Sequence, residues 1–220
     1  MKKTLTFLLA GALALALLAP AASATGLRLG FAYWDAGDVS DVIDDPLLGA
    51  EAAFAIPVSQ YLDLELRFGC LGMSESESQR IDNRYIDADY DMIVVPVEAG
   101  LAIDVPLYNG APIHVFGGGG IGWYFFQHEL TIEEGQRHSR YYEEWSWDEN
   151  DSTFGAYAAA GVRLILGENV SLYGQAQYRW LFDEIDLVSE AANGKDIEDS
   201  AFLGLDPSGF CFSAGIAFNF

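Results

Sequence analysis

The chain has 220 residues, of which 51% are hydrophobic and 14% aromatic, and its formal net charge is −22 at pH 7. So acidic a protein repels the phosphate backbone of nucleic acids, which excludes a general role in binding them. The charge is segregated, because residues 35–47, 72–89, 127–152 and 183–208 carry net charges of −5, −3, −6 and −7. Between these acidic segments lie pairs of stretches that alternate apolar with small or polar residues.

The beginning of the chain has the features of a secretory signal peptide. Two lysines precede an apolar run at residues 5–18, and the small-residue sequence Ala22-Ser23-Ala24 follows it. A basic start, a short apolar run and an Ala-x-Ala site are the marks of a cleaved export signal. The run is also too short to serve as a membrane-spanning helix. We therefore expect a signal peptide at residues 1–24 and a mature, exported domain at residues 25–220.

Eight stretches of the mature chain show the period-two alternation of β-strands. The links after the second, fourth and sixth stretches are short, and two of them contain the hairpin turn signals Asn109-Gly110 and Gly167-Glu168-Asn169. The other connections are the acidic segments. An even number of strands with alternating short and long connections predicts an all-β fold, an eight-stranded antiparallel up-and-down transmembrane β-barrel. The expected strands are residues 26–34, 48–58, 60–71, 90–104, 112–126, 153–166, 170–182 and 209–220.

The charged residues of these strands fall on one face. In the third strand, for example, Glu65 and Arg67 alternate with leucines. An unpaired Arg or Lys facing lipid at mid-membrane costs about 2–4 kcal/mol, so we expect this face to point into the lumen. Side chains just fill the lumen of an eight-stranded barrel, which favours a paired plug over an ion path. The expected lumen charge network is Arg28, Glu51, Asp63, Glu65, Arg67, Glu98, Arg163 and Arg179; Asp104 is left outside it, as a residue near a strand end.

Aromatic residues gather where the strands should meet the two membrane surfaces, as amphipathic rings prefer the headgroup level. The expected outer girdle is Tyr33, Trp34, Tyr90, Trp123, Tyr124, Phe125, Phe126, Trp180 and Phe182. The expected periplasmic girdle is Tyr61, Tyr108, Phe218 and Phe220.

Alternation continues into two of the acidic segments. It predicts that the fifth and sixth strands extend beyond the membrane as a hairpin, and that residues 85–90 extend the fourth strand. Protruding strands offer an exposed edge, and Tyr and Trp are favoured interface residues. The candidate extracellular interaction surface is Tyr141, Tyr142, Trp145 and Trp147. A segment that merely shields the barrel rim is the alternative.

The chain ends in Phe218-Asn219-Phe220 after an alternating strand, which resembles the assembly signal of bacterial outer-membrane barrels, carried here by Phe218 and Phe220. With the signal peptide, the eight strands and the loop asymmetry, the whole mature chain resembles the small outer-membrane barrels of the OmpX type and the OmpA transmembrane domain. The resemblance implies a bacterial outer-membrane protein among lipid and lipopolysaccharide, inserted by the barrel-assembly machinery. It further implies extracellular loops and periplasmic termini, and we expect a monomer.

Candidate chemistry is weak. His128, His138 and Ser139 lie in one acidic segment, but a nucleophile needs a positioned base and an oxyanion hole, and closeness in sequence shows neither. We expect no enzyme; His114 is expected to be a hydrogen-bonding residue of the lumen. The two cysteines, Cys70 and Cys211, are expected to be free thiols because their strands are not neighbours.

One acidic segment is dense in aspartate but lacks the pattern of a calcium loop. A solvated acidic surface is the preferred interpretation, and no cofactor is expected. The alternative is that Ca²⁺ or Mg²⁺ bridges this segment to lipopolysaccharide phosphates. The candidate cation ligands are Asp35, Asp38, Asp41, Asp44 and Asp45.

These patterns favour a barrel with a filled lumen that serves envelope integrity or adhesion-type surface interaction through acidic, aromatic loops. Three alternatives stay open. One is a passage for small hydrophobic molecules, as in OmpW-like barrels, and another is a barrel enzyme that modifies lipid A. The third, a soluble lipocalin-type barrel, requires apolar residues inside, which the placement of Arg and Glu opposes.

Overall fold

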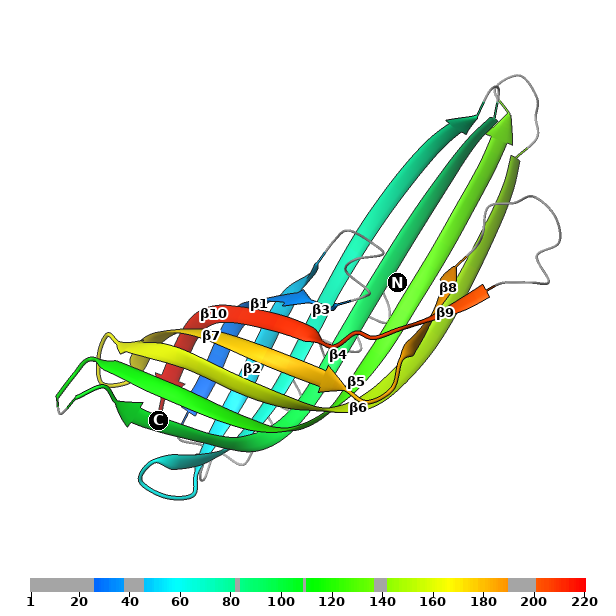
Figure 1. Ribbon diagram of the computed structural model, residues 1–220. Coiled ribbons are helices and arrows are strands. Elements are labelled where there is room, and N and C mark those ends of the chain that lie inside the picture. Colours follow the sequence, from blue (N-terminus) through cyan, green and yellow to red (C-terminus); the bar gives the residue numbers. More distant parts are fainter. Residues whose placement is uncertain (1–25, 38–45, 82–83, 109, 137–141, 190–200) are drawn as a thin grey trace.

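The computed structural model describes residues 26–37, 46–81, 84–108, 110–136, 142–189 and 201–220. In these ranges every secondary-structure element is a β-strand. Eight of them close into an antiparallel barrel in the order β1-β10-β7-β6-β5-β4-β3-β2, which confirms the predicted fold class (Figure 1). No helix in the described ranges is long and apolar enough to cross a membrane. The barrel strands are β1 (Gly26–Asp35), β2 (Leu47–Pro57), β3 (Leu62–Ile81), β4 (Arg84–Pro106), β5 (Ile113–Gln136), β6 (Tyr142–Ile165), β7 (Val170–Leu181) and β10 (Gly209–Asn219).

The first and last strands close the barrel. β1 pairs with β10 over its whole length, from Gly26 opposite Asn219 to Asp35 opposite Phe210. The three short links follow β2, β4 and β6, as predicted, and the turn signals lie in the second and third of them. In the link after β4 the amide of Ala111 donates to the carbonyl of Tyr108 at 2.9 Å. Gly110 in this link has a φ of 79°, a left-handed conformation that glycine adopts without steric cost.

Four neighbouring strands are twice as long as the others. β3, β4, β5 and β6 have 20, 23, 24 and 24 residues, whereas the other barrel strands have 10 to 12. About ten further residues per strand, at 3.3 Å each, extend the sheet by roughly 33 Å. Figure 1 shows the four strands running together beyond the barrel. We call residues 73–81, 84–92, 128–136 and 142–149 of these strands the protruding sheet.

The extensions of β4, β5 and β6 confirm the prediction, but the continuation of β3 through residues 72–81 was not predicted. Its Ser-Glu-Ser-Glu-Ser sequence has no apolar face and was interpreted as a loop. In the structure it pairs with β4 from Met73 opposite Met92 to Ile81 opposite Arg84. Backbone pairing with β4 therefore makes residues 73–81 a strand, although their side-chain pattern does not indicate one.

A small hairpin within the fourth acidic segment was also not predicted. β8 (Ile185–Ser189) pairs with β9 (Ala201–Leu205) outside the barrel sheet, and β8 contacts β6. The amide of Phe182 donates to the carbonyl of Phe154 at 3.0 Å, which ties the start of this segment to β6. Ile185 is fully buried, so the hairpin is attached to the barrel by packing as well.

The prediction of the outer aromatic girdle is correct in part. Tyr33, Trp123, Phe125, Trp180 and Phe182 are exposed on the outside of the barrel, and the Trp123 and Phe125 rings stack with centroids 6.0 Å apart. The prediction is wrong for four other rings, which lie at the strand positions that face the lumen rather than at the alternate, outward positions. These rings are Trp34, Tyr124 and Phe126, which are buried, and Tyr90, which is partly buried and packs against the same cluster.

Candidate functional site

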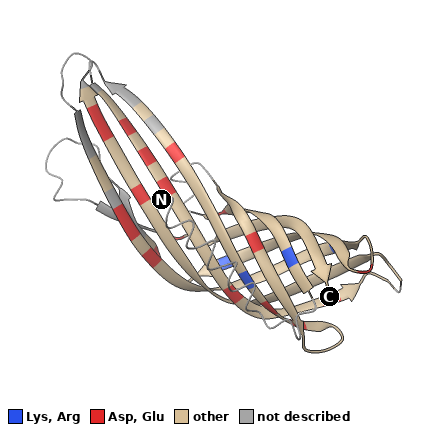
Figure 2. Ribbon diagram, turned by 180° about the vertical axis from the view of Figure 1, so that it is seen from behind, with Lys and Arg blue, Asp and Glu red and all other residues tan. Residues whose placement is uncertain are grey.

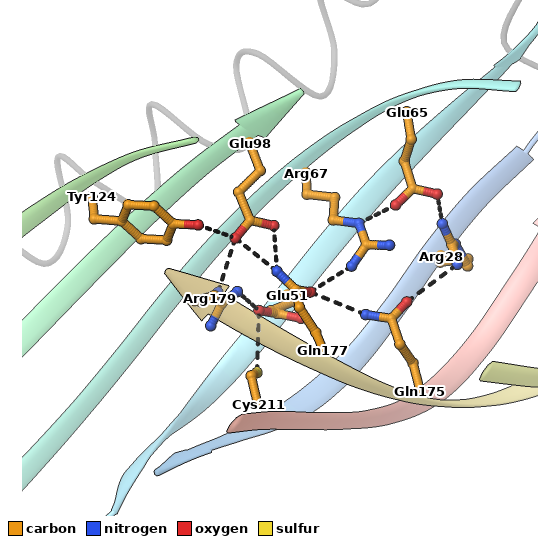
Figure 3. A network of polar contacts seen from close by, with 10 residues as sticks. All are labelled: Arg28, Glu51, Glu65, Arg67, Glu98, Tyr124, Gln175, Gln177, Arg179 and Cys211. Carbon is orange, nitrogen blue, oxygen red and sulfur yellow. Dashed lines mark hydrogen bonds and ion pairs between the residues drawn. The ribbon is translucent and has the colours of Figure 1, made fainter. Parts of the chain in front are cut away.

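Two ion triads occupy the middle of the lumen (Figure 3). In the first, Glu65 of β3 forms ion pairs with both Arg28 of β1 and Arg67 of β3. The guanidinium of Arg28 also lies over the Phe116 ring, 4.9 Å from its centroid, and that of Arg67 lies 5.1 Å from the centroid of the Tyr157 ring. Each arginine of the first triad is thus held by a carboxylate and by the face of an aromatic ring.

The second triad has the opposite composition. Arg179 of β7 contacts Glu51 at 2.5 Å through Nη2 and Glu98 at 2.9 Å through Nε. Its guanidinium lies 4.7 Å from the centroid of the Trp34 ring, and the hydroxyl of Tyr124 donates to Glu98 at 2.9 Å. Arg179 and Glu98 are almost fully buried, so their charges depend on each other.

Gln177 of β7 joins the two triads. Its side-chain oxygen accepts a hydrogen bond from Arg67 at 2.6 Å, and its side-chain nitrogen donates to Glu98 at 2.8 Å. The side-chain nitrogen of Gln175 donates to the side-chain oxygen of Gln177 at 3.2 Å. One triad has a formal charge of +1 and the other of −1, so the bridged pair is neutral, as a water-poor interior requires.

The other two residues of the expected network lie apart from the triads. Arg163 of β6 forms an ion pair with Asp104 at 2.7 Å, and His114 contacts the same carboxylate at 2.7 Å. Asp63 lines a cavity of about 30 Å³ with Arg28, Asp104 and Arg163. Asp104 was not included in the expected network. It is separated from Glu98 by an even number of residues along β4, so the two side chains share the inward parity, that is, they point to the same side of the strand. This alternation could have identified Asp104 as a lumen residue.

The end of the lumen beside the protruding strands is apolar, which was not predicted. A buried cluster that includes Trp34, and that we call the apolar cap, closes the barrel there. The larger members of the cap are Trp34, Leu47, Leu71, Met92, Val94, Tyr124, Phe126, Leu181, Ile185 and Cys211.

The lumen has little empty space. Besides the cavity at Asp63, a second cavity, beside Arg28, Glu51 and Arg67, has about 10 Å³. A water molecule needs at least about 10–15 Å³, so these two cavities hold a few waters at most.

The protruding sheet has two different faces. On the outer face, which continues the lipid-facing side of the barrel, Asp91, Glu129 and Asp148 form one cross-strand row. On the inner face, which continues the lumen side, Ile132 lies opposite Trp145, and both are partly buried. Figure 2 shows acidic residues along the protruding strands and basic residues within the barrel.

Several predicted residues have only a partial description. Trp145 is partly buried; Tyr142 and Trp147 lie on β6, but their side chains, like Tyr141 as a whole, are outside the described part. Asp35 is exposed at the end of β1. Within the described ranges no group of three or more His, Cys, Asp and Glu residues could hold a metal ion. Also outside the described residues are the predicted signal peptide at residues 1–24, Asp38, Asp41, Asp44, Asp45, His138 and Ser139.

The remaining candidates lie in or at the ends of strands. Phe218 of β10 lies opposite Leu27 and Val170, and Phe220 is exposed beyond the strand end. Both cysteines are free; Cys211 is buried in the apolar cap and Cys70 is half-buried. His128 is buried on β5, and its Nε2 lies 3.7 Å from a carboxylate oxygen of Glu149. This spacing is longer than a hydrogen bond.

Comparison with known proteins matches residues 5–218 to the model of the outer membrane protein beta-barrel domain family. Among solved structures, the chain is similar to the outer membrane protein OprG from Pseudomonas aeruginosa, with 12% identity and a TM-score of 0.58, covering 90% of this chain and 97% of that one. It is also similar to a major outer membrane protein from Thermus thermophilus, with 14% identity and a TM-score of 0.51, covering 90% of this chain and 99% of that one.

The attachment invasion locus protein Ail of Yersinia pestis matches with 13% identity and a TM-score of 0.46, covering 90% of this chain and 99% of that one. A comparison with curated protein sequences gives no match. The solved structures support the barrel architecture, and the family model spans nearly the whole sequence. The chain therefore belongs to the outer membrane protein beta-barrel domain family and is a protein of the bacterial outer membrane.

Proposed function

We propose that this protein is a closed barrel that presents the protruding sheet at the cell surface for an adhesion-type interaction. The observation that carries the proposal is the contrast between the two halves of the molecule. The lumen contains a neutral, interconnected charge network beneath an apolar cap, whereas four strands extend roughly 33 Å beyond it. A molecule that conducts solutes requires an open lumen, and conduction gives no reason for strands that extend beyond the barrel.

The charge network supports a closed lumen on energetic grounds. Glu98 is held by Arg179, Gln177 and Tyr124 together. Breaking a buried ion pair costs about 3–5 kcal/mol, so a path for ions through the network requires breaking contacts that stabilise the barrel. The network is therefore a structural plug in this proposal.

The proposed interaction surface is the protruding sheet with Trp145 and the neighbouring Tyr141, Tyr142 and Trp147. Its outer face carries Asp91, Glu129 and Asp148, so a partner with a basic surface is the complementary one. In this proposal the sheet is extracellular and both mature termini are periplasmic. The protein acts as a monomer, inserted by the barrel-assembly machinery with Phe218 and Phe220 as its signal.

Lipopolysaccharide surrounds the outer end of such a barrel. Acidic segments beside its phosphates repel them unless a divalent cation lies between. In this proposal the segment that contains Asp35, Asp38, Asp41, Asp44 and Asp45 is a solvated acidic surface, and weak bridging of that segment to the phosphates by Ca²⁺ or Mg²⁺ is the alternative.

No catalytic role is proposed. His114 is paired with Asp104 inside the lumen, His128 is buried, and Ser139, the candidate nucleophile, lies outside the described residues. A second candidate function is the binding or passage of small hydrophobic molecules, which the apolar cap favours. The charge network beneath the cap opposes passage along the barrel axis.

The proposal is tested by shortening the protruding sheet. Glu75 lies opposite Tyr90 and Glu129 lies opposite Asp148, so residues 76–89 and 130–147 can each be replaced by an Asn-Gly turn. Cells that display the wild type are expected to attach better to a poly-lysine surface than cells that display the shortened protein with Asp91→Asn, Glu129→Gln and Asp148→Asn, and a poly-glutamate surface is the control. Equal attachment at equal surface abundance contradicts the proposed role.

A further inference from the structure

Two methionines and a histidine form one row across three strands at the base of the protruding sheet. Met73 of β3 lies opposite Met92 of β4, and Met92 lies opposite His128 of β5. Directly opposite residues on one face have Cβ atoms about 4.5–5.5 Å apart, so their side chains are in mutual reach. The chain has three methionines, and the third is Met1, so both methionines of the strands lie in this row.

The row is enclosed. Met92 is fully buried and belongs to the apolar cap, and Met73 is partly buried and packs against the cap. His128 is 3% exposed. A long, unbranched thioether side chain adjusts its sulfur position through three rotatable bonds. The three side chains can therefore converge on a shared point at the outer mouth of the barrel.

His128 has unused hydrogen-bonding capacity in this enclosed place. Neither Nδ1 nor Nε2 has a hydrogen-bond partner among the described residues. Buried side-chain nitrogens are normally satisfied, so a buried imidazole with two free nitrogens indicates a ligand that the side chains themselves do not supply. The next residue of the row, Glu149, approaches Nε2 only to 3.7 Å, and its side chain is 39% exposed.

The donor set identifies the class of ligand. The two thioethers are soft, uncharged donors, which select Cu(I), and the neutral imidazole is a borderline donor that also suits copper, whereas carboxylate and carbonyl oxygens suit Mg²⁺ and Ca²⁺. We propose that Met73, Met92 and His128 bind a single cuprous ion. The carboxylate of Glu149 offsets its positive charge, and the partly exposed side of the row, at Met73 and Glu149, gives the ion its path of entry.

This inference is independent of the adhesion-type function, because it uses the inner face at the base of the sheet. It competes with a simpler explanation, in which the methionines only fill the apolar cap and a water molecule hydrogen-bonds to His128. The two explanations differ in whether the protein holds Cu(I) against a chelator, and in whether both methionines and the histidine are needed.

The test uses mature protein purified from outer membranes with both cysteines replaced (Cys70→Ser, Cys211→Ser), since thiolates also bind Cu(I). Anaerobic titration with Cu(I) in the presence of bicinchoninate is expected to give one equivalent bound. Met92→Leu, which conserves volume, and His128→Gln are each expected to weaken binding at least tenfold. The matched control is His114→Gln, at the other end of the lumen, which is expected to leave binding unchanged.

A second readout does not depend on the affinity. Protein labelled with ¹³C at the methionine methyl groups has two such groups, and both signals are expected to shift when Ag(I), a redox-inert mimic of Cu(I), is added. Heat-modifiable gel mobility establishes that every variant is folded. Failure of the folded protein to retain Cu(I), unchanged affinity in both site variants, or methyl signals that do not move each overturn the proposal.

Discussion

Glu98 is the acceptor on which the middle of the lumen depends. Tyr124, Gln177 and Arg179 all donate to its carboxylate. Arg179 has a second carboxylate partner in Glu51, but Glu98 is the one that links Arg179 to Gln177 and, through it, to the first triad. The stability of the two triads is consequently coupled through the carboxylate of Glu98.

Replacing this carboxylate should be costly. Glu98→Gln removes the charge and leaves Arg179 buried with one counter-ion, so we expect a loss of about 3–5 kcal/mol in unfolding free energy. Urea unfolding in lipid vesicles, followed by gel mobility, measures it. Asp104→Asn is the control, since its ion pair is more exposed and should cost less. If both variants were as stable as the wild type, the network would not stabilise the barrel.

A strand glycine gives a second test at this scale. A Cβ on Gly100 would lie 2.4 Å from both the hydroxyl of Tyr157 and the carbonyl oxygen of Gly119. Gly100→Ala therefore overpacks the lumen, and we expect a loss of about 1–3 kcal/mol by the same unfolding assay. Gly174→Ala is the matched control, because nothing lies within 4 Å of its added Cβ. Equal stability of the two variants would show that the lumen has room at Gly100.

Among the elements, β3 to β6 combine two tasks. One half of each strand closes the barrel, and the other half forms the protruding sheet. The shortened protein, in which Asn-Gly turns replace residues 76–89 and 130–147, keeps both ion triads and the Met73–Met92–His128 row. We expect it to insert and to show heat-modifiable mobility like the wild type. An unfolded or protease-sensitive product would mean that the sheet is needed for assembly.

The sequence predicts those elements whose two faces differ in polarity. β5 and β6 were predicted to extend because apolar residues such as Leu130 and Ile132 alternate with polar ones. The extension of β3 was not predicted, since its pairing depends on backbone hydrogen bonds to a partner chosen by the fold. The strands β8 and β9 contain apolar residues such as Ile185 and Leu203, but each has only five residues, too few for the alternation to be recognised within an acidic segment. A strand without an apolar face is indistinguishable from a loop in the sequence alone.

Strand parity also decides how well the candidate site could be predicted. Parity placed Arg28, Glu65 and Arg179 on the inward face, where the structure has them buried or nearly so. It was not applied to the aromatic residues, and Trp34, Tyr90, Tyr124 and Phe126 were assigned to the girdle although they share the inward parity. Which charges pair with which, and the bridging by Gln177, depend on distances across the lumen that no sequence pattern contains.

For the whole molecule, charge separates along the barrel axis. The lumen charges form a neutral pair of triads, while the acidic residues along the protruding strands account for much of the surface charge (Figure 2). The acidity of the chain therefore describes a surface rather than the selectivity of a channel. A closed lumen is the central requirement of this account.

Conductance across a planar lipid bilayer tests that requirement most directly. Purified wild-type protein is predicted to insert without producing steady current steps. The double variant Arg67→Ala, Trp34→Gly, which removes one side chain from the charge network and one from the apolar cap, is predicted to conduct if it folds and inserts. Reproducible ohmic steps from the wild type would contradict the account, because ions would then cross the lumen with both the charge network and the apolar cap in place.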